Sequence, residues 1–314
     1  MPNYQGVWNI TTQFQYAAEW PEVSAGRAIF VLGTGSSANN YNYVDIVSSG
    51  NASVFGNLNV ALYYTSGFSS STRSVTVGGY ASSSSQNHME YVTIASLGNG
   101  TDFGDLTGIT RYASGVSNGT RGVRAGGLEG GGTYQNTMDY VTIASTGNAT
   151  DFGDLTVARG ILGGAESTTR GVILGGVPAA SSYSNVIDYI TIANAGNATD
   201  FGDLSEALGY GGALSSSTRA IGFFTWEGSG TNKMEYVTIA STGNSTDFGD
   251  LTVSTSASFP NGTSNKIKGL IVGTNTNNIQ QLTIASTGNT TDYGDTTAAA
   301  YGGGATSDSH GGLA

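Results

Sequence analysis

Cysteine is missing from this 314-residue chain, and only two histidines and four prolines occur in it. Without cysteine, a small disulfide-stapled fold is excluded, and stability has to come from packing. The two histidines, His88 and His310, are too few for a metal site built on a histidine cluster or for a Ser-His-Asp triad. We therefore expect no enzymatic activity and no catalytic residues.

Charge is also scarce, because charged residues make up only 11% of the chain and 22 acidic residues outweigh 11 basic ones, for a net charge of −11. Binding to nucleic acid needs clustered Lys or Arg, so we expect no nucleic-acid partner. No apolar run is long enough to cross a bilayer, and no basic segment followed by an apolar run opens the chain. We expect no membrane insertion and no signal peptide.

What the chain does contain is 49 glycines and one repeated phrase, which reads close to Tyr-Val-Thr-Ile-Ala-Ser-Thr-Gly-Asn-Ala-Thr-Asp-Phe-Gly-Asp-Leu-Thr. Successive copies start 45 to 49 residues apart. A period of this size is typical of one four-stranded blade of a β-propeller. The copies open at Met89, Met138, Ile187, Met234 and Ile279, with a weaker one at Tyr41.

The copy over 158–206 shows the expected strands most clearly. Alternating β-branched and aromatic residues place Tyr189 and Thr191 on one side of a strand and Ile190 and Ile192 on the other. The following Ala-Gly-Asn is typical of a tight turn. No stretch has helical apolar spacing, so we expect an all-β fold. The four strands are predicted at 160–166, 170–176, 187–193 and 199–204.

A basic residue recurs before the second strand of each copy and serves to count the blades: Arg27, Arg73, Arg121, Arg170, Arg219, Lys268 and His310. The count predicts a single seven-bladed propeller over 1–314, with six blades as the fallback. Both chain ends would complete the last blade, the N-terminal strand lying within 6–11, and closure would remove exposed sheet edges. The expected boundaries are 1–12 for the closing strand, 13–60, 61–108, 109–157, 158–206, 207–253 and 254–297 for the blades, and 298–314 for the split blade.

The order of basic residue, apolar run, Gly-Gly, variable loop, Tyr-containing strand and aromatic outer strand resembles the kelch repeat, whose fold is a β-propeller. Phe103, Phe152, Phe201, Phe248 and Tyr293 stand where kelch repeats usually have Trp. The phrase STGNATDFGDLT and the opening YQGVWNITTQFQYAAEW also look like repeat-bearing structural proteins of marine tailed bacteriophages. That resemblance implies a virion component, such as a tail fibre or another surface appendage.

Two repeated charge patterns suggest structural roles, with a ligand site as the alternative for each. The basic residues are expected to form a ring in which each side chain pairs with a carboxylate of a neighbouring turn, although such a ring could also bind anions. The aspartates of the Asn-x-x-Asp-x-x-Asp spacing could supply oxygen ligands to calcium. We regard Asp151, Asp154, Asp200 and Asp203 as weak calcium candidates, and we expect no other metal and no other cofactor.

The loops after the second strands vary most among the copies and mix Tyr or Trp with Ser, Gly and Asn. This composition suits recognition, because rigid aromatic rings supply contact area and small polar residues adapt to a partner. Trp226 could instead fill space between blades. The candidate ligand-binding residues are Tyr80, Tyr134, Tyr183 and Trp226, in loops at 80–87, 128–137, 177–185 and 226–233.

These observations predict a noncatalytic phage virion protein that presents its loops to a host surface or glycan. Its partners would be other virion proteins and a host glycan or receptor, and its location would be the virion surface, after synthesis in the host cytoplasm. The alternatives are a purely structural or decorative capsid or tail module and a bacterial extracellular adhesin. A glycan-processing enzyme is the distant alternative.

Overall fold

The computed structural model describes residues 26–33, 39–226, 230–253, 258–300 and 302–313. All regular structure in this part of the chain is β-strand, which confirms the all-β prediction. None of these residues belongs to a helix that could cross a membrane. The predicted N-terminal closing strand lies outside the described residues.

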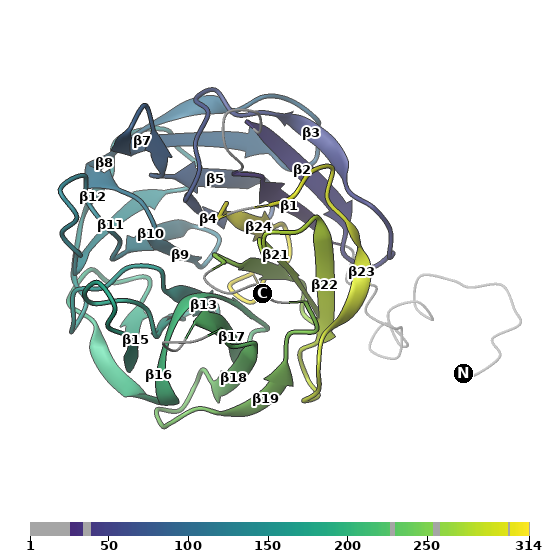
Figure 1. Cartoon of the computed structure of the whole chain (residues 1–314). Coiled ribbons are helices and arrows are strands. Elements are labelled where there is room, and N and C mark those ends of the chain that lie inside the picture. Colours follow the sequence, from purple (N-terminus) through teal and green to yellow (C-terminus); the bar gives the residue numbers. More distant parts are fainter. Residues whose placement is uncertain (1–25, 34–38, 227–229, 254–257, 301, 314) are drawn as a thin grey trace, which may run out of the picture.

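Antiparallel sheets stand around a common axis in a propeller-like ring (Figure 1). In the described residues there are five sheets: three of four strands, one of five and one of seven. From the axis outward, the four-stranded sheets are β24(Ala305–Ser307)-β1(Arg27–Val31)-β2(Asn40–Asp45)-β3(Ser53–Asn57), β9(Ser114–Ser117)-β10(Arg121–Ala125)-β11(Thr137–Thr142)-β12(Thr150–Asp154) and β20(Asn261–Ser264)-β21(Lys268–Val272)-β22(Asn278–Thr283)-β23(Thr291–Asp295).

The five-stranded sheet runs β4(Ser66–Ser69)-β5(Arg73–Val77)-β7(Ser84–Thr93)-β8(Thr101–Thr110), with the short β6(Tyr80–Ala81) paired to β7. The seven-stranded sheet runs β13(Gly163–Glu166)-β14(Arg170–Leu174)-β15(Ser184–Thr191)-β16(Thr199–Ser215)-β17(Arg219–Trp226)-β18(Lys233–Thr238)-β19(Thr246–Asp250). Its long strand β16 pairs β15 through its first part and β17 through its second. It therefore passes without interruption from the periphery to the axis.

The strands of the best-defined copy lie within a few residues of their predicted positions, as β13, β14, β15 and the first part of β16. Ile190 and Ile192 are buried, whereas Thr191 is exposed and Tyr189 half-buried, as the alternation predicts. The Gly175-Gly176 pair that ends the second strand has φ of +59° and +109°. Residues other than glycine rarely adopt such angles, which explains why a Gly-Gly pair recurs at this point.

Apolar contacts between neighbouring sheets form the core. Six buried clusters occur in the described residues, each combining side chains of two neighbouring sheets or of the two halves of the seven-stranded sheet. Phe30 of β1, for example, shares a cluster with Leu270 of β21. The innermost strands contact one another in a closed cycle: β4, β9, β13, β16, β20, β24 and back to β4.

The predicted seventh blade is wrong, because the C-terminal strand does not begin a blade of its own. Strand β24 pairs with β1, in the register Ala28 with Ser307 and Phe30 with Ala305, and becomes the innermost strand of the first sheet. His310 follows β24 and so does not precede a second strand as the repeated arginines do. Strand β24 thus completes the first sheet by pairing with β1, although no turn connects the two strands.

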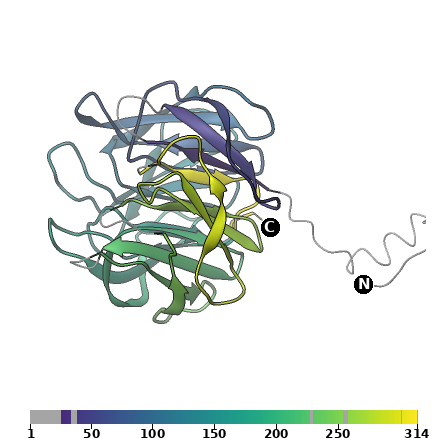
Figure 2. The ribbon, with the colours of Figure 1, turned by 45° about the vertical axis from the view of Figure 1, so that its right-hand side comes forward.

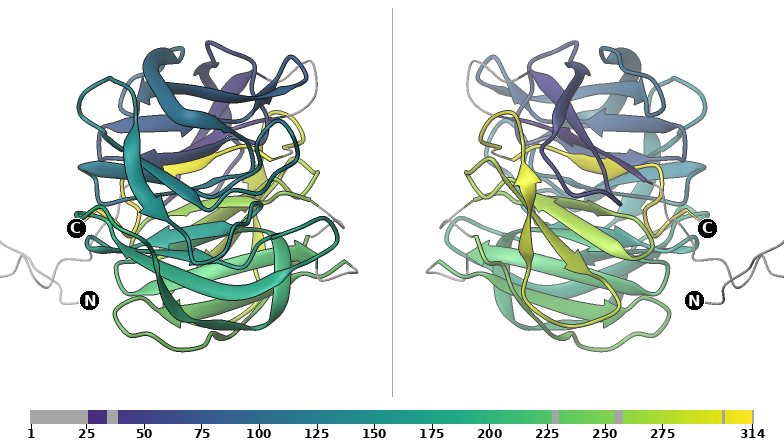
Figure 3. Two further views of the ribbon diagram at one scale, coloured as in Figure 1. Left: turned by 90° about the vertical axis from the view of Figure 1, so that its left-hand side faces the viewer. Right: turned by 90° about the vertical axis from the view of Figure 1, so that its right-hand side faces the viewer.

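The ring has two different ends along its axis, seen from the side in Figures 2 and 3. We call one end the hairpin face, because the turns between the first and second strands lie there, together with residues 308–313. The other end is the loop face, where the loops after the second strands meet the segments that enter each innermost strand. The predicted ligand-binding loops therefore share one face.

Candidate functional site

The repeated basic residues form a structural ring near the hairpin face. Each side chain donates a hydrogen bond to a backbone carbonyl of the next sheet or half-sheet, as Arg170 Nη1 does to Ile239 O at 2.8 Å. Lys268 completes the series by reaching Val47 O of the first sheet at 3.5 Å. The expected carboxylate partners are wrong: no ion pair between these six residues and a carboxylate occurs in the described residues. The other members of this ring, whose side chains donate to backbone carbonyls in the same way, are Arg27, Arg73, Arg121 and Arg219.

Aromatic rings hold these basic side chains in place. The guanidinium of Arg170 lies 4.3 Å from the ring centre of Tyr189 on its own sheet, close enough for a cation–π contact. Tyr189 in turn meets Phe201 edge to face, with centroids 6.0 Å apart. The same stack recurs around the molecule, so the aromatic residues of the third and outer strands serve the architecture.

The aspartate-rich phrase docks neighbouring sheets together. Asn197 Oδ1 accepts a hydrogen bond from the backbone amide of Asp154 on the preceding sheet at 3.0 Å, and Asn244 does the same for Asp203. Asp151 and Asp200, the first aspartates of their copies, are exposed. Among the described residues no three acidic or histidine side chains gather as a metal-binding group, so the four calcium candidates are not brought together.

Buried polar side chains in the third strands are a feature that the sequence reasoning missed. Asp188 is fully buried, forms an ion pair with Arg159 at 2.9 Å and accepts a hydrogen bond from the Thr156 hydroxyl at 2.6 Å. Thr156 follows the outer strand of the preceding sheet, so Asp188 ties two sheets together. A polar residue directly after the apolar or aromatic residue that opens each copy of the repeated phrase was the available signal: Asn42, Glu90, Asp139, Asp188, Glu235 and Gln280.

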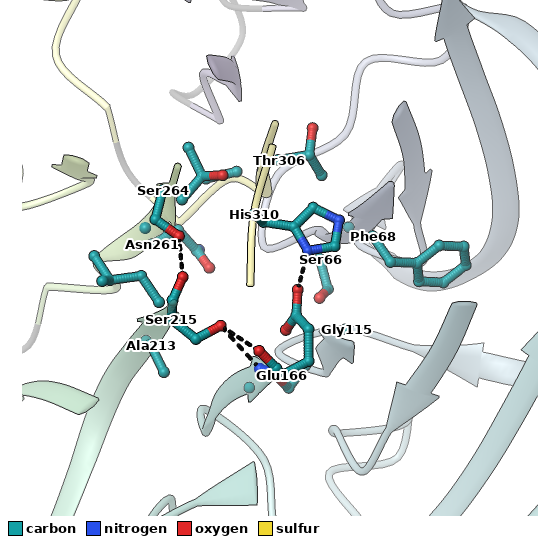
Figure 4. A pocket seen from close by; sticks show the side chains of 18 of the residues that line it. Ser66, Phe68, Gly115, Glu166, Ala213, Ser215, Asn261, Ser264, Thr306 and His310 are labelled. Carbon is teal, nitrogen blue, oxygen red and sulfur yellow. Dashed lines mark hydrogen bonds and ion pairs between the residues drawn. The ribbon is translucent and has the colours of Figure 1, made fainter. Parts of the chain in front are cut away.

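The axis of the ring is lined by polar inner strands (Figure 4). Serine hydroxyls donate to carbonyls of the neighbouring inner strand at 2.6–2.8 Å, from Ser69, Ser117, Ser215, Ser264 and Ser307. A cavity on the axis, lined by Ser69, Ser215 and Ser264 among others, measures about 40 Å³, room for about three water molecules. It is too small for a sugar.

Glu166 stands where the other inner strands carry serine, and it pairs with His310 Nδ1 at 2.7 Å. The imidazole also lies against Ser69 O and the Ser117 hydroxyl. Burial lowers the pKa of His310, but the charge of Glu166 and the hydrogen bonds to Glu166 and Ser69 raise it, so the net pKa is above the ordinary 6.5. His310 is therefore a buried residue on the axis that pairs with Glu166, and it is not a member of the basic ring.

Aromatic side chains gather on the loop face around the mouth of the axis. Their rings form a chain of contacts: Tyr64 to Tyr112 at 4.3 Å, Tyr112 stacked on Phe259 at 4.9 Å, and Phe259 to Tyr210 at 5.1 Å. Tyr210 continues it to Trp226 at 6.2 Å. All are partly exposed. With the residues that adjoin them, we call the following the loop-face cluster: Tyr63, Tyr64, Tyr80, Tyr112, Tyr134, Tyr183, Tyr210, Trp226 and Phe259.

The structure brings the four predicted ligand-binding residues into this cluster. Tyr80 contacts Tyr63 with ring centres 5.3 Å apart, and the Trp226 indole donates a hydrogen bond to the Tyr183 hydroxyl. Burial raises the pKa of Tyr134, with further contributions from nearby Tyr210 and Tyr183. Loops that are far apart in sequence thus supply one continuous aromatic surface.

The centre of the loop-face cluster is held by an unusual backbone. Tyr64, Tyr112, Ile161 and Tyr210 occupy the same position of successive copies and have φ between +55° and +58°. The Tyr112 amide donates to Tyr64 O at 3.0 Å, and the Ile161 amide donates to Tyr112 O at 2.8 Å. We call these four residues and Phe259 the collar. All of them except Tyr210 line a hollow of about 20 Å³.

The sequence reasoning missed the collar residues, although a signal was present. Tyr64, Tyr112, Ile161, Tyr210 and Phe259 recur at steps of 48 or 49 residues, the period of the repeat itself. They lie where an outer strand leads into the next inner strand, and Tyr210 stands at this point inside the continuous strand β16.

No family model matches this chain, and no curated protein matches its sequence. The arrangement of the sheets agrees with the propeller that a kelch-like repeat implies. The resemblance to phage proteins depends on the repeated phrases alone.

Proposed function

We propose that this protein is a noncatalytic binding module of a phage virion, in a tail fibre or another appendage, and that its loop-face cluster binds carbohydrate on a host surface. The observation that supports the proposal is the cluster itself: nine aromatic side chains, all partly exposed, at one end of the axis. The virion assignment depends on the resemblance of the repeated phrases.

Half-exposed tyrosine and tryptophan suit a ligand that is apolar on one face and polar at its edges. Their rings offer flat apolar area, and their hydroxyl and indole groups offer hydrogen bonds at the rim. Carbohydrate rings have this character, with C–H groups on a face and hydroxyls around it.

Backbone strain in the collar favours a binding role over simple filling. A non-glycine residue with positive φ costs about 1–3 kcal/mol, and such residues concentrate at functional sites. Three of the four strained positions carry tyrosine, and the fourth carries isoleucine. The strained residues therefore lie at the mouth of the axis, where a ligand would bind.

The position of the described chain ends supports display of the loop face. Gly26 and residues 308–313 lie at the hairpin face, where Arg27 N donates to Asp308 Oδ1 at 2.9 Å. An attachment made through either end would leave the loop face pointing away from the particle.

We further infer that the ring has six blades, with β16 serving two of them. The six apolar clusters, the closed cycle of six inner strands and the six basic residues that each reach the next unit support this count. Joining of two blades through the continuous strand β16 accounts for the seven-stranded sheet. An experimental density map along the axis would test the number.

The carbohydrate proposal is tested with a glycan panel and with fluorescently labelled protein on host cells. Trp226→Ala removes the largest ring of the cluster, and we expect it to weaken binding about 10- to 100-fold, as loss of an aromatic anchor does. Leu97→Ala is the matched control, because Leu97 is 59% exposed and lies in a turn on the hairpin side of the ring. Equal binding by Trp226→Ala and wild type would overturn the proposal.

Immunogold labelling of phage particles tests the location separately. Label at fibre or tail tips supports an attachment role, and label spread over the capsid favours the decorative module. A working antibody that finds no protein on intact particles contradicts the virion assignment.

A further inference from the structure

Arg111 is a cation within the loop-face cluster. Its guanidinium carbon lies 4.8 Å from the ring centre of Tyr80 and 5.7 Å from that of Tyr112, so both rings are within cation–π range. Nη1 donates a hydrogen bond to the Ser85 hydroxyl at 2.8 Å. The backbone of Arg111 pairs with Leu128 in both directions, which fixes the position from which the side chain extends.

Among the described residues, the Arg111 side chain differs from the basic ring and from the two buried arginines because it has no carboxylate or carbonyl partner. Arg124 and Arg159 form buried ion pairs, and the basic ring binds backbone carbonyls. In the described part of the chain no carboxylate forms an ion pair with Arg111, not even the neighbouring Glu129. Of its five N–H donors, only one has a side-chain acceptor there.

We infer that the loop face selects acidic carbohydrate and that Arg111 binds the carboxylate of the sugar. This inference rests on the proposed carbohydrate function. The planar guanidinium matches a carboxylate through two parallel hydrogen bonds, and the flanking rings restrict its rotation. Tyr80 and Tyr112 lie next to the bound anion and offer aromatic faces on which the ring of the sugar can stack.

Electrostatics make Arg111 the place on the loop face where an anionic sugar would bind. The chain carries a net charge of −11, so an anionic ligand is repelled by most of the surface and needs a local cation. The charge of Arg111 already affects the pKa of a neighbouring tyrosine. Burial and neighbouring tyrosines raise the pKa of Tyr63, and the charge of Arg111 opposes them.

The experiment compares acidic oligosaccharides with their carboxyl-reduced, neutral counterparts on the full chain. Oligogalacturonates, oligomannuronates and sialylated oligosaccharides serve as probes, and calorimetry gives the dissociation constants. We expect the wild type to bind at least one acidic probe about 10- to 100-fold more tightly than its reduced form, the range for a charge-assisted hydrogen-bond pair. Arg111→Gln should remove that difference while keeping the binding of the neutral form.

Lys266→Gln is the matched control, because it removes the same charge from an exposed position on the hairpin face. Arg111→Lys keeps the charge without the fork and should retain part of the preference. Circular dichroism and thermal unfolding verify that each variant folds.

The outcomes separate the two proposals. If acidic and neutral probes bind equally, and Arg111→Gln binds both as the wild type does, the selection for acidic sugars is wrong and the carbohydrate function stands. If the wild type binds no probe of either kind, both proposals fail. A preference that Lys266→Gln abolishes as strongly as Arg111→Gln would also contradict the role of Arg111.

Discussion

Single residues in this protein do the same work several times around the ring, and the exceptions mark special positions. Arg170 fastens its half of the seven-stranded sheet to the other half through the carbonyl of Ile239, while the Tyr189 ring holds its guanidinium in place, and its counterparts repeat both contacts. Glu166 breaks the series of axial serines, and His310 compensates by bringing an opposite charge. A buried pair of this kind is costly to break, since the remaining charge is left without a partner.

The His310–Glu166 pair makes stability depend on pH. The pKa of His310 is raised in the folded state, because the attraction of Glu166, the carbonyl of Ser69 and Asp308 together outweigh burial. The stabilisation is therefore complete below the unfolded-state value of 6.5 and is lost as the pH rises through the folded-state value. We expect the stability difference between wild type and His310→Gln to be largest below pH 6.5 and to shrink as the pH rises above that value.

Urea denaturation of both proteins at several pH values measures this difference. Glu166→Gln should flatten the same dependence, because it removes the charge that holds the proton on His310. A constant difference across the range would show that the pair does not titrate with folding.

At the scale of elements, turns dock onto the outer strands of neighbouring sheets at close range. Gly153 lies in β12 with φ of +137°, and a Cβ there would come within 2.5 Å of Gly196 O. Asn197 then fixes the turn through its side-chain oxygen. The repeated Phe-Gly-Asp of one outer strand therefore contacts the repeated Gly-Asn of the neighbouring turn.

Replacement of Gly153 by alanine should lower the free energy of unfolding by about 2 kcal/mol or more, because the added methyl group meets backbone that cannot move aside. Gly108→Ala is the control, since nothing lies within 4 Å of a Cβ at that position. We expect its effect to stay within about 0.5 kcal/mol. Equal losses in the two variants, measured by urea denaturation, would contradict the docking role.

At the scale of the whole molecule, the innermost and second strands of the first sheet, β24 and β1, are not joined by a hairpin turn as they are in the other sheets. Contacts between the segments next to these strands take the place of that turn. Arg27 N bonds to Asp308 Oδ1 at 2.9 Å, as Arg73 N bonds to Ser70 Oγ at 3.0 Å within an unbroken turn. A Cβ on Gly26 would lie 2.2 Å from Ser309 Oγ, so these two residues are adjacent. The ring is therefore continuous in space where it is broken in sequence.

A circular permutant should consequently fold. The variant leaves out residues 1–25 and 310–314 and joins Ser309 directly to Gly26. Its new ends lie between Ser71 and Thr72, which are both exposed. It carries Glu166→Ser, which restores the serine of the other inner strands in the absence of His310. We expect a monomer with the wild-type far-ultraviolet spectrum and one cooperative unfolding transition.

A second permutant, opened inside β10 between Val123 and Arg124, is the control and should not fold. Failure of the first permutant as complete as that of the second would show that the break is not equivalent to a turn.

The sequence predicted the elements well, because their signals are local. Alternation placed Ile190 and Ile192 inside and Thr191 outside, and Gly175-Gly176 marked the end of a strand. The number of blades was predicted less well, since His310 was counted with the repeated basic residues although it follows Lys268 by only 42 residues and the others are 46 to 49 apart. It sits on the axis opposite Glu166. Spacing records position along the chain, and it carries no information on which strand pairs across the break.

The repeat period and the alternation of side chains by themselves determined an all-β chain built from copies of one small sheet, because strand geometry and turn chemistry depend on neighbours in sequence. Only the tertiary structure decided how the ring closes, what the repeated arginines bind and which aromatic residues meet. Tyr80, Tyr134, Tyr183 and Trp226 come from separate copies, and the collar residues that join them lie in other segments. Their convergence depends on the packing of sheets around an axis, which no single copy encodes.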